Sequence, residues 1–432
     1  MMPQKLGASF VPLEGNSKNA RKPPVSPTRI LSLNTFAFTV SFAVWLMYGV
    51  LLKFLTSHGI YEWSQSELAI LMATPILTGS LMRFPVGVLT DKWGGHPVQL
   101  GVLLLTAGGA FSVYFADSFL GFLLAGLTFG FAGTSFAVGV AFTSVWFKKE
   151  NQGFALGVFG AGNAGAALTQ ILGPKLLNFL TDNGEHLDNW RKFPLVYGVI
   201  LLATSVIFLS LSENKLPAAK FRKSFEERML PLKNIRVWRF GFYYVLLFGG
   251  FVGLSNWLLN YYVEVYAVSL ATAGLLAGAF SLPSSLVRAG GGWLSDKIGA
   301  RTVMYWVLSA CLLGCVALSF KMSLTPFTLI VVAIGFAMGL GMAAVYKHIP
   351  TYFPGEVGVV GGVVGVLGGL GGFACPLIFG GLLTATTSSA RPEGLWTTSW
   401  MFLALLSLLC LGWMHGAIHR QKRSVAAPPP GD

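Results

Sequence analysis

Long apolar runs fill most of this 432-residue chain and constrain its fold more than any other feature. Each run holds about 18 residues or more, which as a helix is enough to cross a hydrocarbon core of roughly 30 Å. Only 11% of the residues are charged, less than half of the usual share in soluble proteins. We count twelve runs, which span residues 31–55, 66–89, 98–116, 119–146, 153–179, 193–212, 237–263, 269–293, 302–320, 325–349, 357–384 and 396–415. The sequence therefore predicts an all-α membrane protein with twelve transmembrane helices.

The basic residues between these runs are distributed unequally. When the loops are assigned alternately to the two sides of the membrane, one set holds 21 Lys or Arg residues and the other holds four. Cytoplasmic loops carry such an excess, so we expect an integral protein of the cytoplasmic (inner) membrane with both termini in the cytoplasm. The net charge of +13 then reflects orientation and not nucleic-acid binding. Residues 1–30, polar and without the apolar core of a signal peptide, predict a disordered cytoplasmic tail, and residues 416–432 predict a second one.

The two halves of the chain repeat each other. The stretch "RFPVGVLTDKWGGHPV" (83–98) superposes without gaps on "RAGGGWLSDKIGARTV" (288–303), and the offset of 205 also carries Gly160 onto Gly365. A polar interruption at 213–236, which we expect to be a cytoplasmic loop, separates a bundle at 31–212 from a bundle at 237–415. Such self-similarity predicts two pseudo-symmetric six-helix bundles, the major facilitator fold, with a binding site between them.

The loop that closes each repeated stretch resembles the loop signature of the major facilitator superfamily. That signature has a Gly, then Asp, then Lys or Arg, between the second and third helices of each half. The resemblance implies a structural latch on the cytoplasmic side in preference to a substrate contact. In this chain its residues are Gly87, Asp91 and Lys92, and Gly292, Asp296 and Lys297.

Two arginines lie inside apolar runs at matching depths. Arg83 and Arg288 each precede the Asp of the latch by eight residues, so on a continuous helix each lies about 12 Å from the cytoplasmic edge. A charge at that depth costs roughly 2.5 to 3.5 kcal/mol. All 17 acidic residues fall in tails, loops or helix ends, and the nearest to a core are Glu67 and Glu264. Without a carboxylate at their depth, the arginines indicate that an anion is the missing partner.

The planar fork of Arg suits a planar oxyanion, which it can hold with two hydrogen bonds. An anion between two arginines on opposite halves would also favour closure of the halves, which predicts alternating access. Phe42, Phe136, Tyr244 and Phe248 lie at intermediate depth in their runs. An aromatic slot of this kind favours a small anion.

The stretch "GAGNAG" (160–165) fits the G-x-G-x-x-G fingerprint of a dinucleotide site, but its surroundings do not. It belongs to an apolar run without charge until Lys175, and the acidic residues that follow, Asp182 and Glu185, fall in a loop on the outer side. Small residues at such spacing let transmembrane helices pack closely, which we expect here. Asn163 in this motif has two interpretations that stay open: a bond to a neighbouring helix, or a bond to the substrate.

Two glycine-rich motifs resemble the nitrate/nitrite porter family of the major facilitator superfamily. "GAGNAGAALTQ" (160–170) is similar to the first nitrate signature of that family, and "GVLGGLGGFACP" (365–376) is similar to its second. Motifs such as "FAVW" and "LMRFP" extend the resemblance over all twelve helices. The resemblance implies that Arg83 and Arg288 clamp the anion from opposite halves. It also implies hydrogen bonds from Asn163 and Tyr244, an aromatic sandwich of Phe42, Phe136 and Phe248, close backbone approach at Gly133, Gly368 and Gly371, and a Lys347 that draws anions toward the site. Gly368 or Gly369 stands where the first signature has its Asn, so an amide from the second half is not expected.

The function that follows is transport of nitrate and nitrite by alternating access, without a chemical reaction, a cofactor or a metal. The protein would be a monomer in the lipid bilayer, with nitrate, nitrite and possible protons as its partners. Cys311, Cys315, Cys375 and Cys410 lie in apolar runs, and the six His residues form no cluster, so neither type offers a metal or enzyme site. A membrane oxidoreductase would need a nucleotide domain or paired haem histidines.

The mode of coupling is open. Import of an anion against an inside-negative potential needs a compensating charge, yet no mid-membrane Asp or Glu is available to relay a proton, which favours electroneutral nitrate/nitrite exchange. The motifs "FAVW" and "GVFGAGNAGAALTQ" are closer to the proton-coupled branch of the family, so we place proton-coupled nitrate uptake first and exchange second. Transport of another small monovalent anion, such as formate, is a further alternative.

Overall fold

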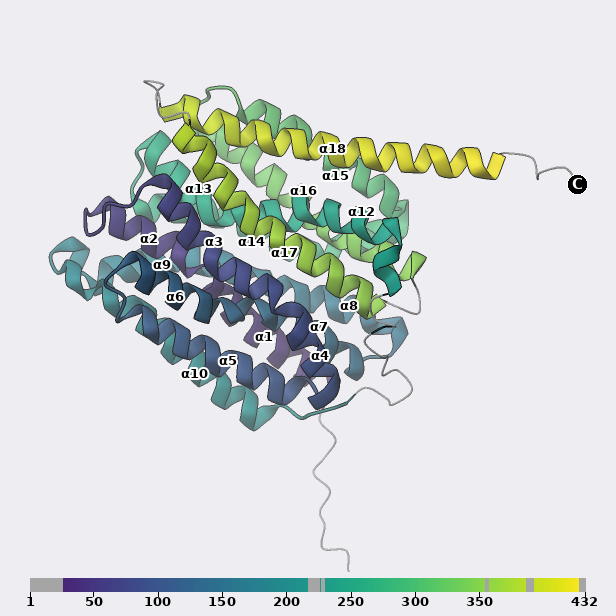
Figure 1. Cartoon of the computed structure of the whole chain (residues 1–432), viewed down its shortest axis with the longest axis horizontal. Coiled ribbons are helices and arrows are strands. Elements are labelled where there is room, and N and C mark those ends of the chain that lie inside the picture. The colour runs from purple at the N-terminus through teal and green to yellow at the C-terminus, as the bar shows by residue number, and fades with distance from the viewer. Residues whose placement is uncertain (1–25, 217–225, 227–229, 354–356, 386–391, 427–432) are drawn as a thin grey trace, which may run out of the picture.

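A computed structural model of the chain describes residues 26–216, 226, 230–353, 357–385 and 392–426. In this part of the chain every regular element is a helix (Figure 1). The α-helices are Pro27–Trp45 (α1), Met47–Ser57 (α2), Gln65–Leu81 (α3), Arg83–Trp93 (α4), Gly95–Val113 (α5), Phe119–Phe129 (α6), Ser135–Trp146 (α7), Lys149–Gly160 (α8), Gly165–Leu180 (α9), Lys192–Leu211 (α10), Ile235–Tyr244 (α12), Gly250–Tyr266 (α13), Leu270–Ile298 (α14), Ala300–Leu318 (α15), Leu324–Tyr352 (α16), Val357–Ala385 (α17) and Pro392–Ala426 (α18). The short 3₁₀ helices are Gly130–Thr134 (η1), Ala161–Ala164 (η2), Asp182–Gly184 (η3), Leu187–Arg191 (η4) and Leu230–Lys233 (η6), and Val245–Gly249 (η7) is a π-helix.

These helices combine into twelve spans that are long and apolar enough to cross a membrane, which confirms the expected number. Several spans contain two helices in series, such as α1 with α2 and α3 with α4. The predicted N-terminal tail lies outside the described residues except for its last few positions, where α1 already begins at Pro27. The central loop is also only partly described. At the other end α18 continues to Ala426, beyond the predicted boundary at 415.

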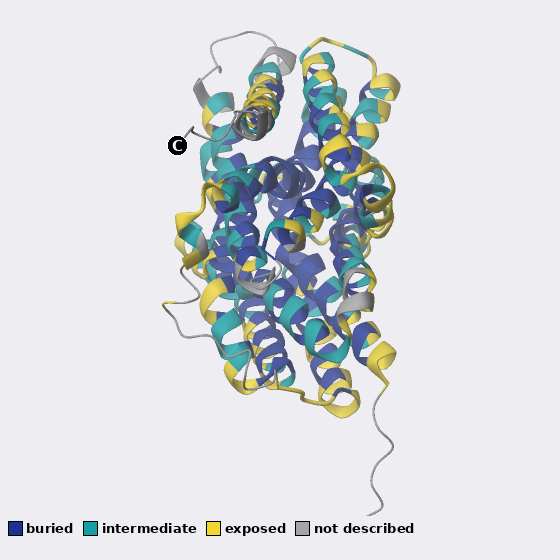
Figure 2. Cartoon of the chain, turned by 90° about the vertical axis from the view of Figure 1, so that its right-hand side faces the viewer, coloured by how far each residue is buried: buried dark blue, intermediate teal, exposed yellow. Residues whose placement is uncertain are grey.

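The helices of the first half gather on one side of the molecule and those of the second half on the other (Figure 1). Contacts between the halves run along α3 and α17, along α9 and α14, and along α2 and α13. Buried residues concentrate toward the middle of the molecule, while exposed ones gather at its ends and outer faces (Figure 2). Residues of the interface between the halves are therefore largely buried.

The internal repeat is visible in the backbone. α4 is followed by Gly94, whose φ is +90°, and α14 is followed by Gly299, whose φ is +85°. Glycine adopts positive φ without the steric penalty of a Cβ, so both latch loops need glycine at this position. The two glycines are separated by the same 205 residues as the repeated stretches.

The second span is not the continuous helix that the sequence predicts. α3 ends at Leu81, Met82 has φ −75° and ψ −8°, and α4 begins at Arg83. Pro85 explains the break, because its ring nitrogen has no hydrogen to donate to the carbonyl of Leu81, one helical turn earlier. The depth estimate for Arg83 is unaffected, since α4 itself is regular as far as the latch.

The four cysteines are free and buried, as predicted for small residues of the apolar core.

Candidate anion-binding site

Arg83 begins α4 and is only 3% exposed. Its Nε donates to the carbonyl oxygen of Gly133 in η1 at 3.2 Å, and its Nη1 donates to the carbonyl oxygen of Gly365 in α17 at 2.5 Å. Its Nη2 is buried and has no described partner. The two carbonyls satisfy two donors but carry no net charge, so the guanidinium keeps an uncompensated charge and an Nη2 group whose two N–H donors have no described partner.

Aromatic rings surround the guanidinium of Arg83. Its Cζ lies 5.6 Å from the ring centroid of Trp45, 5.4 Å from that of Phe136 and 5.2 Å from that of Phe248. Phe136 comes from α7 and Phe248 from η7, and their rings are 6.4 Å apart with 26° between their planes. Ring faces attract a cation, worth about 2 kcal/mol or more at desolvated sites. The rings thus help to keep Arg83 charged in the core.

Arg288 occupies the equivalent position in the other half and is 7% exposed. Its Nη2 donates to the hydroxyl of Tyr244 at 3.3 Å, and its Nη1 is buried without a described partner. A Cβ placed on Gly160 would lie 3.5 Å from the Cζ of Arg288, so this guanidinium packs against the end of α8. Each arginine therefore reaches a glycine of the opposite half, and Gly160 and Gly365 are themselves related by the repeat.

A π-helix positions the aromatic residues of the seventh span. Tyr244 ends α12, and Phe248 lies one turn later in η7. Their rings stack at 5.2 Å with 2° between their planes. A π-helical turn widens the helix and re-aims side chains, and such turns are frequent at functional sites. In this chain the Tyr244 hydroxyl bonds Arg288, whereas the ring of Phe248 lies beside Arg83.

The sequence left open whether Asn163 bonds a neighbouring helix or the substrate. It lies in η2, is fully buried, and neither its Oδ1 nor its Nδ2 has a hydrogen-bond partner among the described residues. A buried polar group left without a partner costs about 1 to 3 kcal/mol. The described residues offer Asn163 no bond to a neighbouring helix, and a bond from its amide to a ligand stays a prediction.

The glycines around these residues permit close approach of helices. A Cβ on Gly368 would lie 2.2 Å from the ring of Tyr244, and one on Gly371 would lie 2.9 Å from the backbone of Val245. A Cβ on Gly133 would lie 2.6 Å from the indole of Trp45. The GAGNAG motif behaves likewise, since a Cβ on Gly165 would lie 2.1 Å from a backbone oxygen of α1. The close-packing interpretation of this motif is confirmed, and no strand precedes it.

The remaining aromatic residue of the prediction, Phe42, is buried and lies behind Trp45 as seen from Arg83. Its ring contacts those of Phe38 and Trp45 at 5.6 and 5.5 Å, and Trp45 is the one beside Arg83. The sequence prediction missed three residues of the site: Trp45, Gly365 and Tyr346. The ring of Tyr346 lies 5.2 Å from Tyr244. "FAVW" and the second glycine motif contain the first two. Tyr346 directly precedes Lys347, which the sequence prediction named.

The buried charged side chains of the described residues are cationic, as the sequence predicts for the surroundings of the arginines. Among the described residues no Asp or Glu is buried, which confirms that the arginines have no carboxylate at their depth. A third buried cation, Lys53, was missed by the sequence prediction, and it pairs with Glu264 near the end of α13.

The latch residues form contacts at the helix ends on the side of the basic loops. Asp296 makes an ion pair with Lys347 of α16, and both side chains are exposed to solvent in part. The amine of Lys297 lies 4.2 Å from the ring centroid of Trp293. A structural role for Asp296 fits this pair. The role of Lys347 in drawing anions toward the site stays a prediction.

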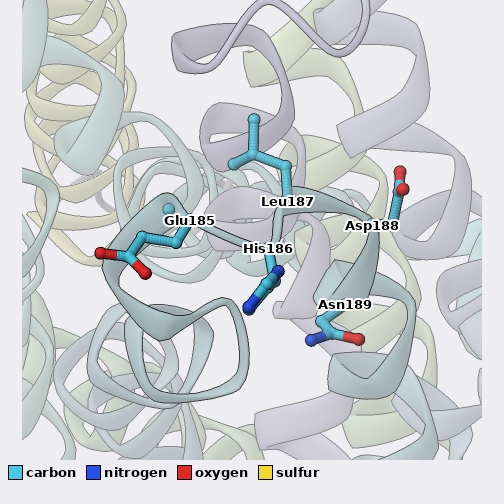
Figure 3. A pocket seen from close by; sticks show the side chains of 6 residues that line it. Glu185, His186, Leu187, Asp188 and Asn189 are labelled. Atoms are coloured by element: carbon cyan, nitrogen blue, oxygen red, sulfur yellow. The ribbon is translucent and has the colours of Figure 1, made fainter.

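A surface pocket lies in the connection between α9 and α10, lined by Gly184–Asn189 (Figure 3). Its loop belongs to the side opposite the basic loops, and the pocket includes the carboxylates of Glu185 and Asp188. Acidic side chains repel an anion, so this pocket does not compete with the arginine site as an anion site.

Comparison with known proteins agrees with this arrangement. The model of the Major Facilitator Superfamily matches residues 34–320 and 258–430. A protein of Thermus thermophilus named "Probable nitrate/nitrite antiporter NarK1" is 42% identical over 412 residues, covering 90% of each chain. The "Nitrite extrusion protein" of Bacillus subtilis is 28% identical, covering 89% of this chain and 94% of its own.

Solved structures support the fold. A bacterial homologue of the human lysosomal transporter Spinster, in an inward-facing and occupied conformation, has a TM-score of 0.71 at 15% identity and covers 92% of this chain and 98% of its own. At that identity the likeness concerns the fold alone. The motifs, the two-bundle fold and the relatives together establish that the chain belongs to the nitrate/nitrite porter family of the major facilitator superfamily.

Proposed function

We propose that this protein transports nitrate and nitrite across the membrane by alternating access, holding one anion between Arg83 and Arg288. The observation that carries the proposal is a set of buried donors without partners among the described residues: Nη2 of Arg83, Nη1 of Arg288 and the amide of Asn163. No buried carboxylate of the described chain can neutralise the two guanidinium groups. A ligand that fits must be anionic and must accept several hydrogen bonds.

The shape of the surroundings narrows the class of anion. The rings of Phe136 and Phe248 lie nearly parallel beside Arg83, and Tyr244 stacks on Phe248. A flat anion can lie between aromatic faces while its oxygens accept bonds from donors at its edge. Nitrate is planar with three such oxygens, and nitrite is planar with two. The names of the Thermus and Bacillus relatives support the same substrates.

The position of the site supports alternating access. Arg83 and Arg288 belong to different bundles and carry like charges, which repel each other. Phe248 beside Arg83 stacks on Tyr244, the hydrogen-bond partner of Arg288. An anion between them replaces that repulsion with two attractions, which favours approach of the halves when substrate is bound. The mechanism requires no chemical step and no cofactor. We further propose that the protein is a monomer. On the distribution of basic loops, we also propose that it lies in the cytoplasmic membrane with both termini inside.

Coupling to protons remains our first proposal from the sequence, and nitrate/nitrite exchange is the second candidate. The lack of a buried Asp or Glu among the described residues favours exchange, because exchange of two monovalent anions is electroneutral. Proteoliposomes separate the two modes. Uptake of labelled nitrate that needs internal nitrite and ignores a pH gradient indicates exchange, whereas uptake that needs only the pH gradient indicates symport.

The substrate itself is tested by competition in the same vesicles. Excess nitrate or nitrite should suppress uptake of labelled nitrate. Equal concentrations of formate should have little effect, because the central atom of formate carries a C–H bond where nitrate has a third oxygen and nitrite has a lone pair. Absence of nitrate uptake by correctly inserted protein under both coupling conditions would sink the proposal.

A further inference from the structure

A second charge cluster, made of one buried and one partly exposed side chain, joins the two halves far from the arginines. Nζ of Lys53 in α2 lies 3.1 Å from Oε1 of Glu264 in α13. The same oxygen accepts a hydrogen bond from Nε2 of Gln65, the first residue of α3, at 2.9 Å. Lys53 and Gln65 belong to the first half and Glu264 to the second. The side chain of Lys53 is 9% exposed and that of Glu264 is 26% exposed, so the pair is largely shielded from water.

The cluster lies at the outer end of the molecule, the end opposite the basic loops. Gln65 precedes Arg83 by 18 residues along one span, a distance of about 27 Å at the rise of an α-helix. Glu264 is two residues from the end of α13. The cluster therefore lies between the anion site and the outer solution and does not form part of the anion site.

Other contacts between the halves at this end are close enough to exclude a Cβ. A Cβ on Gly380 of α17 would lie 2.4 Å from the side chain of Ala69 in α3, and one on Gly274 of α14 would lie 2.1 Å from the backbone oxygen of Gln170 in α9. The side-chain amide of Gln170 also donates to the carbonyl oxygen of Ser255 across the interface at 2.6 Å. The halves are thus in direct contact along their outer parts.

We infer that Lys53, Glu264 and Gln65 form the outer gate of this transporter. The inference rests on the proposed alternating access, which requires the outer ends of the halves to separate when the site opens outward. The charges of Lys53 and Glu264 are compensated while the gate is closed and become hydrated when it opens. Removal of one partner leaves the other charge buried and unpaired in the closed gate only, so it shifts the protein toward the outward-open state. These are positioning residues that act on access to the site.

Accessibility of a single cysteine behind the gate tests this directly. Ser255→Cys is introduced into a variant whose four native cysteines are replaced, and a membrane-impermeant thiol reagent is added from outside without nitrate. Glu264→Gln should raise the labelling rate by about tenfold or more. Glu62→Gln, which neutralises an exposed acid in the loop between α2 and α3, is the matched control and should leave the rate unchanged.

Two further variants keep the test decisive. The charge swap Lys53→Glu with Glu264→Lys restores an ion pair and should return labelling toward the original rate, which loss of structure would not do. Gln65→Ala removes a donor without stranding a charge, and it should raise labelling less than Glu264→Gln. Unchanged labelling in both Glu264→Gln and Gln65→Ala, at normal amounts in the membrane, overturns the gate. The readout uses no nitrate, so a failure of the proposed substrate would appear separately, as absent uptake by the original protein.

Discussion

Arg83 donates a hydrogen bond across the interface to the carbonyl oxygen of Gly365, and the repeat-related Arg288 packs against Gly160 in the opposite direction. Each bundle therefore presents one guanidinium to a glycine-lined helix of the other. A Cβ on Gly160 would lie 3.5 Å from the Cζ of Arg288, and one on Gly365 would lie 3.3 Å from the hydroxyl of Tyr346 and 3.9 Å from Nη1 of Arg83. The pair of contacts explains why arginines and glycine motifs recur together in both halves, and it identifies where substitutions should act.

Replacement of either arginine by lysine should reduce nitrate uptake by about 100-fold or more, with normal membrane insertion. A compact ammonium cannot reproduce the planar fork that reaches Gly133 and Gly365 and still offers a donor to the anion. Uptake into proteoliposomes measures the effect. Arg191→Lys is the control, because Arg191 contacts Asp117 on the surface at the outer end. Near-normal uptake by both Arg83→Lys and Arg288→Lys would rule out the clamp.

Asn163→Leu should weaken nitrate binding by about tenfold without lowering the thermal stability of the empty protein. The amide has no described partner to lose, and its burial costs about 1 to 3 kcal/mol. Gln99→Leu should behave oppositely, because the buried amide of Gln99 donates to the hydroxyl of Ser135, which the substitution would leave without that donor. Melting curves with and without nitrate measure both effects. A clear loss of stability in empty Asn163→Leu would point to a structural bond instead.

Tyr244→Phe should raise the KM for nitrate by about tenfold or more while the ring stack on Phe248 is retained. The hydroxyl is the described partner of Arg288, and loss of a hydrogen bond to a charged group costs about 1.5 to 3 kcal/mol. The neighbouring Tyr243 also has a buried hydroxyl, but without a described partner. Tyr243→Phe should therefore leave KM unchanged, and equal effects of the two substitutions would contradict a specific role for Tyr244.

Gly368→Ala should abolish transport by displacing the ring of Tyr244, which would lie 2.2 Å from the added Cβ. Overpacking of this kind typically costs about 1 to 3 kcal/mol. Gly362→Ala on the same helix adds the same methyl group where no atom lies within 4 Å, and it should be tolerated. Uptake assays together with melting curves distinguish loss of the site from loss of the fold. Normal uptake by Gly368→Ala would show that Tyr244 can move without consequence.

Much of the architecture was predictable because it depends on patterns along the chain. The length of the apolar runs determines how many spans there are, and the gapless repeat at an offset of 205 predicts two equivalent bundles. The matching depth of Arg83 and Arg288 follows from counting residues to the latch. The break at Met82 was missed, although Pro85 could have indicated it.

The partners of these residues were decided by the tertiary structure. The sequence by itself determined a twelve-span anion carrier with two unpaired arginines, because hydrophobic length, charge and repetition are properties of single segments. It did not determine that Arg83 reaches Gly365 or that Lys53 meets Glu264, since these contacts join residues far apart in the chain. Nor did it determine that Asn163 has no partner among the described residues. Such pairings depend on which faces of tightly packed helices meet, and apolar helices that are buried on many sides carry little periodicity to reveal those faces.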